Sequence, residues 1–232
     1  MSEEKQIPRH VGIIMDGNRR WATEKGLPTL EGHKEGYLKM KSIPGIFFNH
    51  GVEIVSVYAF STENWKRSEK EVNYLMKLLT QAFTEDLEEF HKEGYKLVIS
   101  GRIEDLPDEL PDICKNAMEK TKENKRGVFN ICLNYGGRPE IVDAIQKIVK
   151  ENIPAEKINE ELIQKYLYHG ELPDPDIIVR TSGEKRISGF LLWESAYSEF
   201  LFLQKYWPDF NEEDVQVVLQ EYTKRKRRFG GN

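Results

Sequence analysis

A short apolar run that stops at an aspartate, followed by a Gly-Asn turn and two arginines, constrains the fold of this chain more than any other segment. From His10 to Trp21 the chain reads His-Val-Gly-Ile-Ile-Met-Asp-Gly-Asn-Arg-Arg-Trp. The apolar run has the length of one buried strand, and the residues after the turn predict a helix. A carboxylate at a strand end can hold a divalent cation, and the free N–H groups of a helix N-terminus suit a phosphate. The segment therefore indicates diphosphate chemistry, although a strand followed by a solvated helix with incidental arginines is the simpler alternative.

Strand candidates alternate with helical segments along the whole chain. The strand candidates are residues 10–15, 54–60, 96–100, 129–134, 176–180 and 199–203, and helical periodicity marks residues 35–49, 69–90, 140–150, 159–168 and 212–226. This alternation predicts an α/β fold with a mostly parallel central sheet flanked by helices. No repeat or long linker divides the chain, so we expect a single domain over residues 1–232, with about 1–8 and 228–232 as flexible ends.

The composition limits the classes of protein to which the chain can belong. Charged residues make up 31% of it, and no apolar run approaches the ~20 residues of a spanning helix. The polar N-terminus lacks the apolar region of a secretory signal. Cys114 and Cys132 are the only cysteines, and we expect them to be reduced in a cytoplasmic protein. A net charge of −5 argues against a nucleic-acid partner.

Five consecutive cations, Lys224 to Arg228, stand near the end of this acidic chain. They could complement the C-terminal dipole of a helix, contact anionic lipid at a membrane surface, or fold back over an anionic substrate. The sequence does not choose among these three interpretations, so a peripheral membrane contact stays an expectation only.

The segment 69–90 carries one continuous apolar stripe. Ser68 and Glu71 form a capping box that predicts the helix start. Apolar residues then recur at steps of three and four: Val72, Leu75, Met76, Leu79, Phe83, Leu87 and Phe90. Such a stripe is core by default. Part of it, with the short side chain of Ala59, could instead line an apolar tunnel for a hydrocarbon at the carboxyl ends of the strands.

Charged residues follow several of the predicted strands, where ligands of such sheets bind. Arg67, Arg180 and Arg186 are candidate phosphate clamps, because guanidinium offers a planar fork of donors and stays charged. Two diphosphates would bring roughly five or six negative charges, which calls for several cations and a metal. We predict Asp16 and Glu199 as Mg²⁺ ligands. Glu199, however, starts its strand, and a capping or ion-paired role is the simpler alternative.

Other polar and aromatic residues near these strand ends have two interpretations each. His33 could be structural or could touch a phosphate near a helix N-terminus. Ser61 and Asn64 could bind substrate or assist proton removal, and a relay through water or diphosphate oxygen is favoured because asparagine is a poor base. Trp21 and Trp65 are core residues by default, yet either could stack over an allylic cation.

Motifs of several other enzyme classes are missing. The chain has no Gly-x-x-x-x-Gly-Lys-Ser/Thr loop and no Gly-x-Gly-x-x-Gly, which argues against nucleotide and dinucleotide binding. The nucleophilic aspartate of an Asp-x-Asp-Gly phosphatase would fall at Ile14. An Asp-Asp-x-x-Asp cluster, which all-helical trans-prenyl synthases use for Mg²⁺, is also absent.

Several long motifs, in order, resemble those of the cis-prenyltransferases, also called isoprenyl transferases, whose bacterial representative is undecaprenyl diphosphate synthase. The resemblance runs from His10 to about Gly230. Beyond the first motif it rests on Gly32-His33-Lys-Glu-Gly36, Tyr58 to Arg67, Asn134-Tyr-Gly-Gly-Arg138, Pro175 to Glu184, Arg186 to Trp193 and Trp207-Pro-Asp-Phe.

The resemblance implies an enzyme, usually a homodimer, that extends an allylic diphosphate, typically farnesyl diphosphate, by repeated cis addition of isopentenyl diphosphate. It also implies that Asp16 is essential and binds Mg²⁺ with Glu199, and that Asn64 is the candidate for proton abstraction. The implied allylic diphosphate site comprises Gly17, Asn18, Arg19, Arg20, Trp21 and His33. The implied isopentenyl diphosphate and condensation sites comprise Arg67, Arg180, Arg186, Ile187, Ser188, Ser61, Thr62, Glu63, Asn64 and Trp65.

Several positions depart from the motifs of the family, among them Ser182, where glycine is common in bacterial members. Thr29 stands where many members have an arginine before Gly-His, and Arg19 replaces a frequent glycine. Gly189 and Glu194 stand where asparagine and glutamine are usual. Product length stays open, although the lack of an insertion after Ser68 favours a short or medium product.

Two alternatives to a catalytic prenyltransferase remain at this point. The first is a non-catalytic partner subunit of a heteromeric prenyltransferase, although such subunits typically lack the Asp-Gly-Asn-Arg-Arg segment that this chain keeps. The second is an adaptor that binds nucleic acid or membrane through its basic tail.

Overall fold

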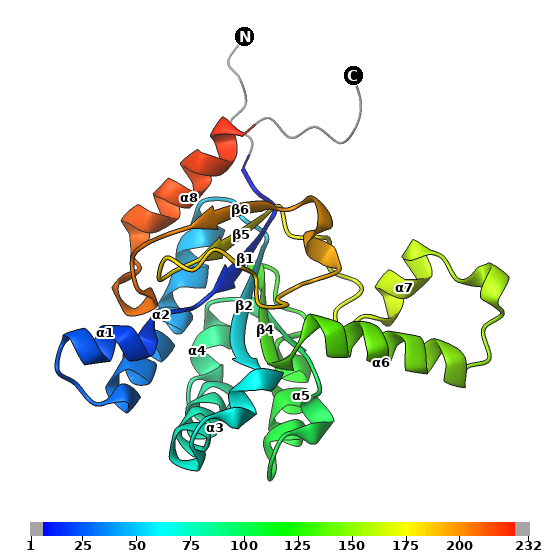
Figure 1. Ribbon diagram of the computed structural model, residues 1–232, viewed down its shortest axis with the longest axis horizontal. Helices are drawn as coiled ribbons and strands as arrows, with labels where there is room; N and C mark the ends of the chain where they lie inside the picture. Colours follow the sequence, from blue (N-terminus) through cyan, green and yellow to red (C-terminus); the bar gives the residue numbers. More distant parts are fainter. Residues whose placement is uncertain (1–6, 226–232) are drawn as a thin grey trace.

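The computed structural model describes residues 7–225 and contains a six-stranded sheet whose strand pairings are all parallel (Figure 1). Along the sheet the order is β3-β4-β2-β1-β5-β6. The strands are β1 (His10–Ile14), β2 (Ile54–Ser61), β3 (Tyr95–Ser100), β4 (Gly127–Tyr135), β5 (Ile177–Arg180) and β6 (Glu199–Phe202). Each predicted strand is therefore confirmed, with bounds that shift by no more than about two residues. The flexible ends predicted at 1–8 and 228–232 lie outside the described residues, apart from residues 7 and 8.

The helices connect these strands and form the sides of the sheet. They are α1 (Asn18–Glu24), α2 (Thr29–Asn49), α3 (Glu69–Phe83), α4 (Leu87–Lys92), α5 (Leu110–Thr121), α6 (Gly137–Lys150), α7 (Glu160–Tyr166) and α8 (Glu212–Lys224). Helix α5 lies in a segment for which we had predicted no element. Helices α6 and α7 extend from the body of the molecule as an arm, coloured green to yellow in Figure 1.

The single helix predicted over residues 69–90 is wrong, because the chain breaks between α3 and α4. Asp86, which precedes α4, faces helix α2 at this break. Its carboxylate accepts hydrogen bonds from the Tyr37 hydroxyl and, at 2.7 Å, from Lys41 Nζ. Periodicity along one segment cannot reveal such a contact, since both donors come from a different helix.

Strand β1 lies in the interior of the sheet and is buried along its whole length. Val11 and Ile13 belong to the large core cluster that helices α2, α3, α5 and α8 complete on one face. Ile14 belongs to a smaller cluster on the other face, with Phe190 and Leu191 from an irregular segment. A Cβ atom at Gly12 would lie 3.1 Å from the Phe190 ring, so this glycine allows the segment to approach the strand closely.

The chain leaves the neighbouring strands β1 and β5 in opposite directions along the sheet, and this determines where the site lies. After β1 the chain passes to β2 on one side, whereas after β5 it passes to β6 on the other. The carboxyl ends of β1 and β5 therefore border the point at which the strand order reverses, where open α/β sheets bind their ligands. Within residues 7–225, no helix has the length and apolar character needed to cross a bilayer.

Candidate active site

The turn between β1 and α1 holds Asp16 at the carboxyl edge of the sheet. Gly17 has a φ of 108°, a left-handed conformation that favours glycine, and a Cβ atom there would lie 2.7 Å from the Tyr206 ring. The Thr181 hydroxyl, just beyond β5, donates to the Asp16 carbonyl at 2.6 Å. The turn is thus attached to the neighbouring strand, and the Asp16 carboxylate has a fixed position.

Arg180 is the principal partner of Asp16. Its Nη2 donates to Asp16 Oδ2 at 2.8 Å, and its Nη1 donates to the Arg186 carbonyl and, at 2.9 Å, to Ser188 Oγ. Arg180 is buried, and its Nε has no hydrogen-bond partner among the described residues. Ser188 adopts a φ of 50°, uncommon outside glycine, to present its hydroxyl to this guanidinium. A buried guanidinium with an unused donor is well suited to an anionic ligand.

Further cations surround Asp16. Arg20 lies 3.6 Å from its carboxylate and also contacts Glu184 at 3.3 Å. Among the other residues near this cavity, Glu71 Oε1 lies 2.9 Å from His33 Nε2 and 3.2 Å from Arg67 Nη1. Burial lowers the pKa of both His33 and Arg67, and in each case Glu71 opposes the shift. Glu71 therefore holds both side chains in place, and our sequence analysis missed this role.

Helices α1 and α2 meet at backbone level beside this site. A Cβ atom at Gly32 would lie 2.1 Å from the Asn18 carbonyl oxygen, and one at Gly36 would lie 2.6 Å from the Asn18 amide. Only glycines permit this approach. The Asn18 side-chain oxygen is buried without a hydrogen-bond partner among the described residues. Asn18 lines the first cavity, so this oxygen is an unused hydrogen-bond acceptor beside it.

A first cavity, of about 540 Å³, has a polar end and an apolar end. The polar end is lined by Asp16, Gly17, Asn18, Arg19, Arg20, Thr23, His33, Asn64 and Arg67. The apolar end lies between α2, α3 and β2, and is lined by Tyr37, Met40, Ala59, Leu75, Leu78 and Leu79. Pairing of β2 with β4 shifts register around Ala59, at a bulge of the kind that redirects side chains beside active sites.

Part of the apolar stripe lines the first cavity, and the predicted tunnel itself stays a prediction. Leu75, Leu79 and Ala59 line the first cavity, together with Leu78, which the stripe did not include. Four other members of the stripe belong to the core: Val72, Met76, Phe83 and Phe90. One part of the stripe thus lines the cavity, and the other part packs in the core.

A second cavity, of about 640 Å³, adjoins the first. It is lined by Ile14, Ser61, Glu63, Gly136, Gly137, Arg138, Pro139, Arg180, Ser188, Gly189 and Leu192. Both cavities share Met15, Asp16, Tyr58, Asn64 and Arg67. Two binding spaces therefore meet at one carboxylate, one guanidinium and one amide.

Most of the predicted site residues line these two cavities, and six do not. The six are Trp21, Thr62, Trp65, Arg186, Ile187 and Glu199. The indole N–H of Trp21 donates to Asp209 at 2.8 Å, and that of Trp65 donates to Asn134 at 2.8 Å. The exposed Arg186 side chain pairs with Glu184, while its backbone carbonyl holds Arg180.

Asn64 is held by its own turn. It lies in the 3₁₀ segment Thr62–Lys66, where its side-chain oxygen accepts the Ser61 backbone N–H at 3.1 Å in a reciprocal capping box. This bond engages the amide oxygen, and Asn64 lines both cavities, so its amide N–H₂ is the group available to a ligand. Asn64 is therefore arranged to donate a hydrogen bond to a ligand there.

Glu199 does not lie near Asp16. It begins β6, where it pairs through Ile177 with Val11, five residues before Asp16. Five strand residues span roughly 16 Å, so the two carboxylates do not form one metal site within this chain. Glu199 instead pairs with Arg225 at 2.6 Å, which corresponds to the ion-paired alternative that we had considered.

Tyr58, Arg138 and Glu71 contribute to the site and were not predicted. Tyr58 and Arg138 belong to the quoted motifs, and their position after β2 and β4 was the available signal. Glu71 gave a misleading signal, because the capping box predicted with Ser68 explained its presence. Its backbone N–H does donate to Ser68 Oγ, but its carboxylate contacts His33 and Arg67 and does not complete the box.

Comparisons with known proteins agree with this geometry. Residues 14–230 match the family model described as putative undecaprenyl diphosphate synthase. The chain belongs to this family. An isoprenyl transferase of Clostridium perfringens is 46% identical over 98% of this chain and 92% of its own length. A ditrans,polycis-undecaprenyl-diphosphate synthase, (2E,6E)-farnesyl-diphosphate specific, of Micrococcus luteus is 45% identical over 97% of this chain and 92% of its own.

Among solved structures, lavandulyl diphosphate synthase from Lavandula x intermedia, in complex with dimethylallyl diphosphate, superposes with a TM-score of 0.92. It is 33% identical to this chain and covers 97% of it and 99% of its own chain. The undecaprenyl diphosphate synthase family is a family of prenyltransferases, so this chain is a prenyltransferase. Identity at this level over nearly the whole length favours the catalytic interpretation over the non-catalytic partner subunit.

Proposed function

We propose that the chain joins isopentenyl diphosphate, held in the second cavity, to an allylic diphosphate, held in the first, in repeated cis additions. The observation that carries this proposal is the meeting of the two cavities at Asp16, Asn64 and Arg67. Only the first cavity continues into an apolar end, as a growing hydrocarbon requires. The Micrococcus luteus relative is named for undecaprenyl diphosphate and for farnesyl diphosphate. Its name supports farnesyl diphosphate as the primer here and a polyprenyl diphosphate, such as undecaprenyl diphosphate, as the product.

The residues of the polar end would act mainly by position and charge. Arg20 and Arg67 would bind the allylic diphosphate and stabilise it as the C–O bond breaks and the diphosphate departs with the bonding electrons. Arg180, with Ser188 beside it, would hold isopentenyl diphosphate so that its double bond faces the allylic carbon. The Asn64 amide would orient the acceptor, and the proton would leave through water or a diphosphate oxygen.

Asp16 fits a role in holding Mg²⁺ between the two cavities. Its carboxylate is partly exposed, with Oδ1 3.6 Å from Arg20 and Oδ2 paired with Arg180. Magnesium commonly takes one or two carboxylates, and completes its shell with phosphate oxygens and water. Bound there, the ion would neutralise charge on the leaving diphosphate. Glu199 would take no part in this site within one chain.

Radiolabelled isopentenyl diphosphate with geranyl, farnesyl or geranylgeranyl diphosphate, resolved by chain length, tests the reaction directly. We expect magnesium-dependent incorporation in steps of one isoprene unit, with farnesyl diphosphate preferred. Absence of incorporation with every primer, from protein that remains folded, would contradict the proposal. Release of inorganic phosphate without chain extension would contradict it as well.

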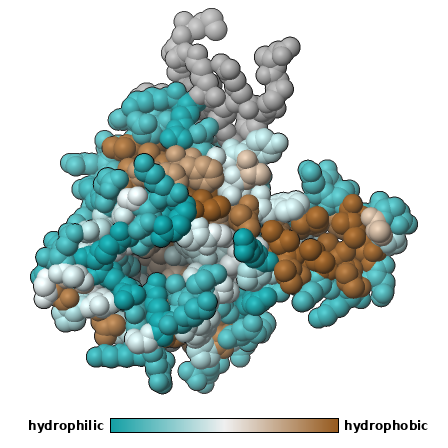
Figure 2. Space-filling model, viewed as in Figure 1, coloured by the Kyte–Doolittle hydropathy of each residue, from teal (hydrophilic) through white to brown (hydrophobic). Residues whose placement is uncertain are grey.

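We also propose that the chain forms a homodimer through the arm made by α6 and α7. Helix α6 exposes Val142, Ile145 and Val149, which are 48, 49 and 66% accessible. Figure 2 shows a broad apolar patch over this arm. Exposed patches of this kind mark interaction surfaces. Val149→Lys should convert the dimer into a monomer, as measured by size-exclusion chromatography with light scattering. Lys150→Glu, on the same helix, is the control and should stay dimeric. A monomeric wild type would refute the proposed dimer.

A further inference from the structure

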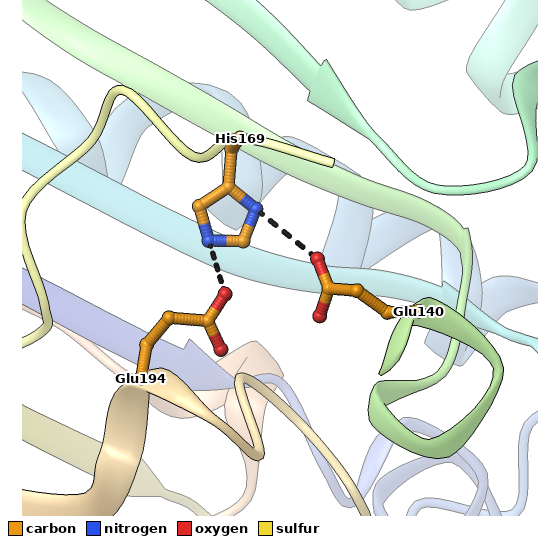
Figure 3. A group of neighbouring side chains, drawn as sticks. All are labelled: Glu140, His169 and Glu194. Carbon is orange, nitrogen blue, oxygen red and sulfur yellow. Dashed lines mark ion pairs between the residues drawn. The ribbon is translucent and has the colours of Figure 1, made fainter. Parts of the chain in front are cut away.

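Three ionisable side chains meet in the interior, outside both cavities (Figure 3). Glu140 lies in the first turn of α6, His169 lies between α7 and β5, and Glu194 begins a short 3₁₀ segment, Glu194–Tyr197. Their exposures are 0, 5 and 1%. Two buried carboxylates require compensation, because an isolated charge is costly in the interior.

The imidazole of His169 separates the two carboxylates. Its Nε2 lies 2.9 Å from Glu194 Oε1, and its Nδ1 lies 3.7 Å from Glu140 Oε1 (Figure 3). Neither Glu194 oxygen and neither His169 nitrogen forms a hydrogen bond among the described residues, so the compensating contact is the ion pair between the imidazole and Glu194. Glu140, in contrast, accepts hydrogen bonds from the Tyr135 hydroxyl and, at 3.1 Å, from the Tyr168 N–H.

A divalent metal ion or a proton could balance these charges. One ligand atom from each residue lies within 4.8 Å of the others, as a metal site requires. A metal ion, however, binds one imidazole nitrogen, whereas the carboxylates here face different nitrogens. A protonated imidazole carries an N–H on each nitrogen, so it presents positive charge to both carboxylates in this arrangement. The geometry therefore favours an imidazolium.

The cluster joins the two segments that form one wall of the second cavity. Glu140 follows Gly137 and Arg138, and Glu194 follows Ser188 and Gly189 in the segment that packs against β1. Among the described residues, one backbone hydrogen bond joins the two segments at the cavity wall. The Gly137 N–H donates to the Gly189 carbonyl at 2.9 Å.

We propose that His169, as an imidazolium between Glu140 and Glu194, is a positioning residue that holds this wall in the shape that binds isopentenyl diphosphate. The inference rests on the function proposed for the second cavity. Glu194 is one of the departures from the family's motifs, which usually have glutamine at this position. A cluster with two glutamates around His169 is therefore a feature of this chain and not of the motif.

The groups that face the cluster determine how it responds to pH. They are His10, Cys132, Tyr135, Tyr168 and Asp174. Burial lowers the pKa of His10 to about 4, so His10 stays neutral. Burial also acts to lower the pKa of His169, but the two glutamates outweigh it and the net shift is upward. Burial and Glu194 raise the pKa of Glu140 to about 7.

Both shifts have the same sign for stability. The folded protein holds these protons more strongly than the unfolded chain, whose ordinary values are 4.5 for Glu140 and 6.5 for His169. Stability from the cluster is therefore greatest at low pH and is lost as pH rises from about 4.5 through 7 and above. Glu194→Gln, which removes the charge and keeps the shape, should flatten this dependence.

Steady-state kinetics of Glu194→Gln and His169→Gln test the positioning role. We expect KM for isopentenyl diphosphate to rise about tenfold in each, with KM for the allylic diphosphate changed less than about twofold. His50→Gln, at the end of α2, and the exposed Glu156→Gln are the matched controls and should match the wild type. Unchanged kinetics in both cluster variants, in an active enzyme, would overturn the inference. An inactive wild type would instead overturn the proposed function.

Two further measurements need no substrate. Imidazole ¹H–¹⁵N correlation spectra across pH 5–9 should show His169 with protons on both nitrogens at pH 6, lost only above the range of an ordinary histidine. A neutral His169 at pH 6 would contradict the proposal. So would metal analysis of the purified protein that finds a tightly bound transition metal which Glu194→Gln removes.

Discussion

At one end of the first cavity the walls carry Asp16, Arg20 and Arg67, and at the other they carry Met40, Leu75 and Leu79. The polar end draws its residues from several elements and fixes them by named contacts, such as the Arg180–Asp16 pair and the Glu71 carboxylate. The apolar end is lined mainly by hydrocarbon side chains, and the Tyr37 hydroxyl there is already engaged with Asp86. We therefore expect residues of the polar end to determine the reaction rate and residues of the apolar end to determine product length.

Asp16→Asn is the most severe test of the polar end. Asparagine keeps an oxygen for Arg180 but removes the charge, so turnover should fall on the order of 10³-fold or more. Asp16→Ala would also leave the buried Arg180 without its carboxylate and would add a stability loss, which makes it the poorer variant.

Glu184→Gln is the matched control for Asp16→Asn, because this carboxylate also contacts Arg20 and has similar exposure, 31% against 30%. It should change turnover less than about threefold, as measured by isopentenyl incorporation at saturating substrates. Equal losses in the two variants would remove the special position that we assign to Asp16.

Arg67→Gln should lower kcat/KM by about 10²–10³-fold, because Arg67 lines both cavities. Product length should stay the same, since the apolar end is untouched. Arg102→Gln, whose arginine pairs with Asp143 outside both cavities, is the control. A changed product distribution in Arg67→Gln would break the proposed division between the two ends.

Ala59→Phe tests the role of the apolar end in setting product length. The larger side chain would project into the apolar end, so products should become shorter by one or more isoprene units. The first condensation should slow less than about threefold. Chain-length analysis of radiolabelled products checks this, with Leu38→Phe, an exposed apolar position on α2, as the control.

The smallest effect that we predict is a gain. Thr29 lies one helical turn before His33 in α2, so an arginine there would extend toward the polar end. Thr29→Arg should lower KM for the allylic diphosphate about threefold, with kcat unchanged. Thr29→Gln, which adds length but no charge, separates the charge from the added bulk.

The sequence predicted the sheet and most of the polar end because both follow from local patterns. Apolar runs of strand length marked the six strands, and residues after β1, β2 and β5 were expected to meet, because parallel strands end at one edge. The break between α3 and α4 and the opposite position of Glu199 depend on tertiary contacts and strand register. The Glu140–His169–Glu194 cluster unites residues far apart in the chain, so no spacing could indicate it.

Gly32 and Gly36 have a mechanical consequence. Because Asn18 rests directly against the backbone of α2, no layer of side chains between α1 and α2 can slide or deform. The wall of the first cavity that α2 provides would therefore hold its shape as a hydrocarbon lengthens against it. The reacting diphosphates would then keep their alignment through successive additions.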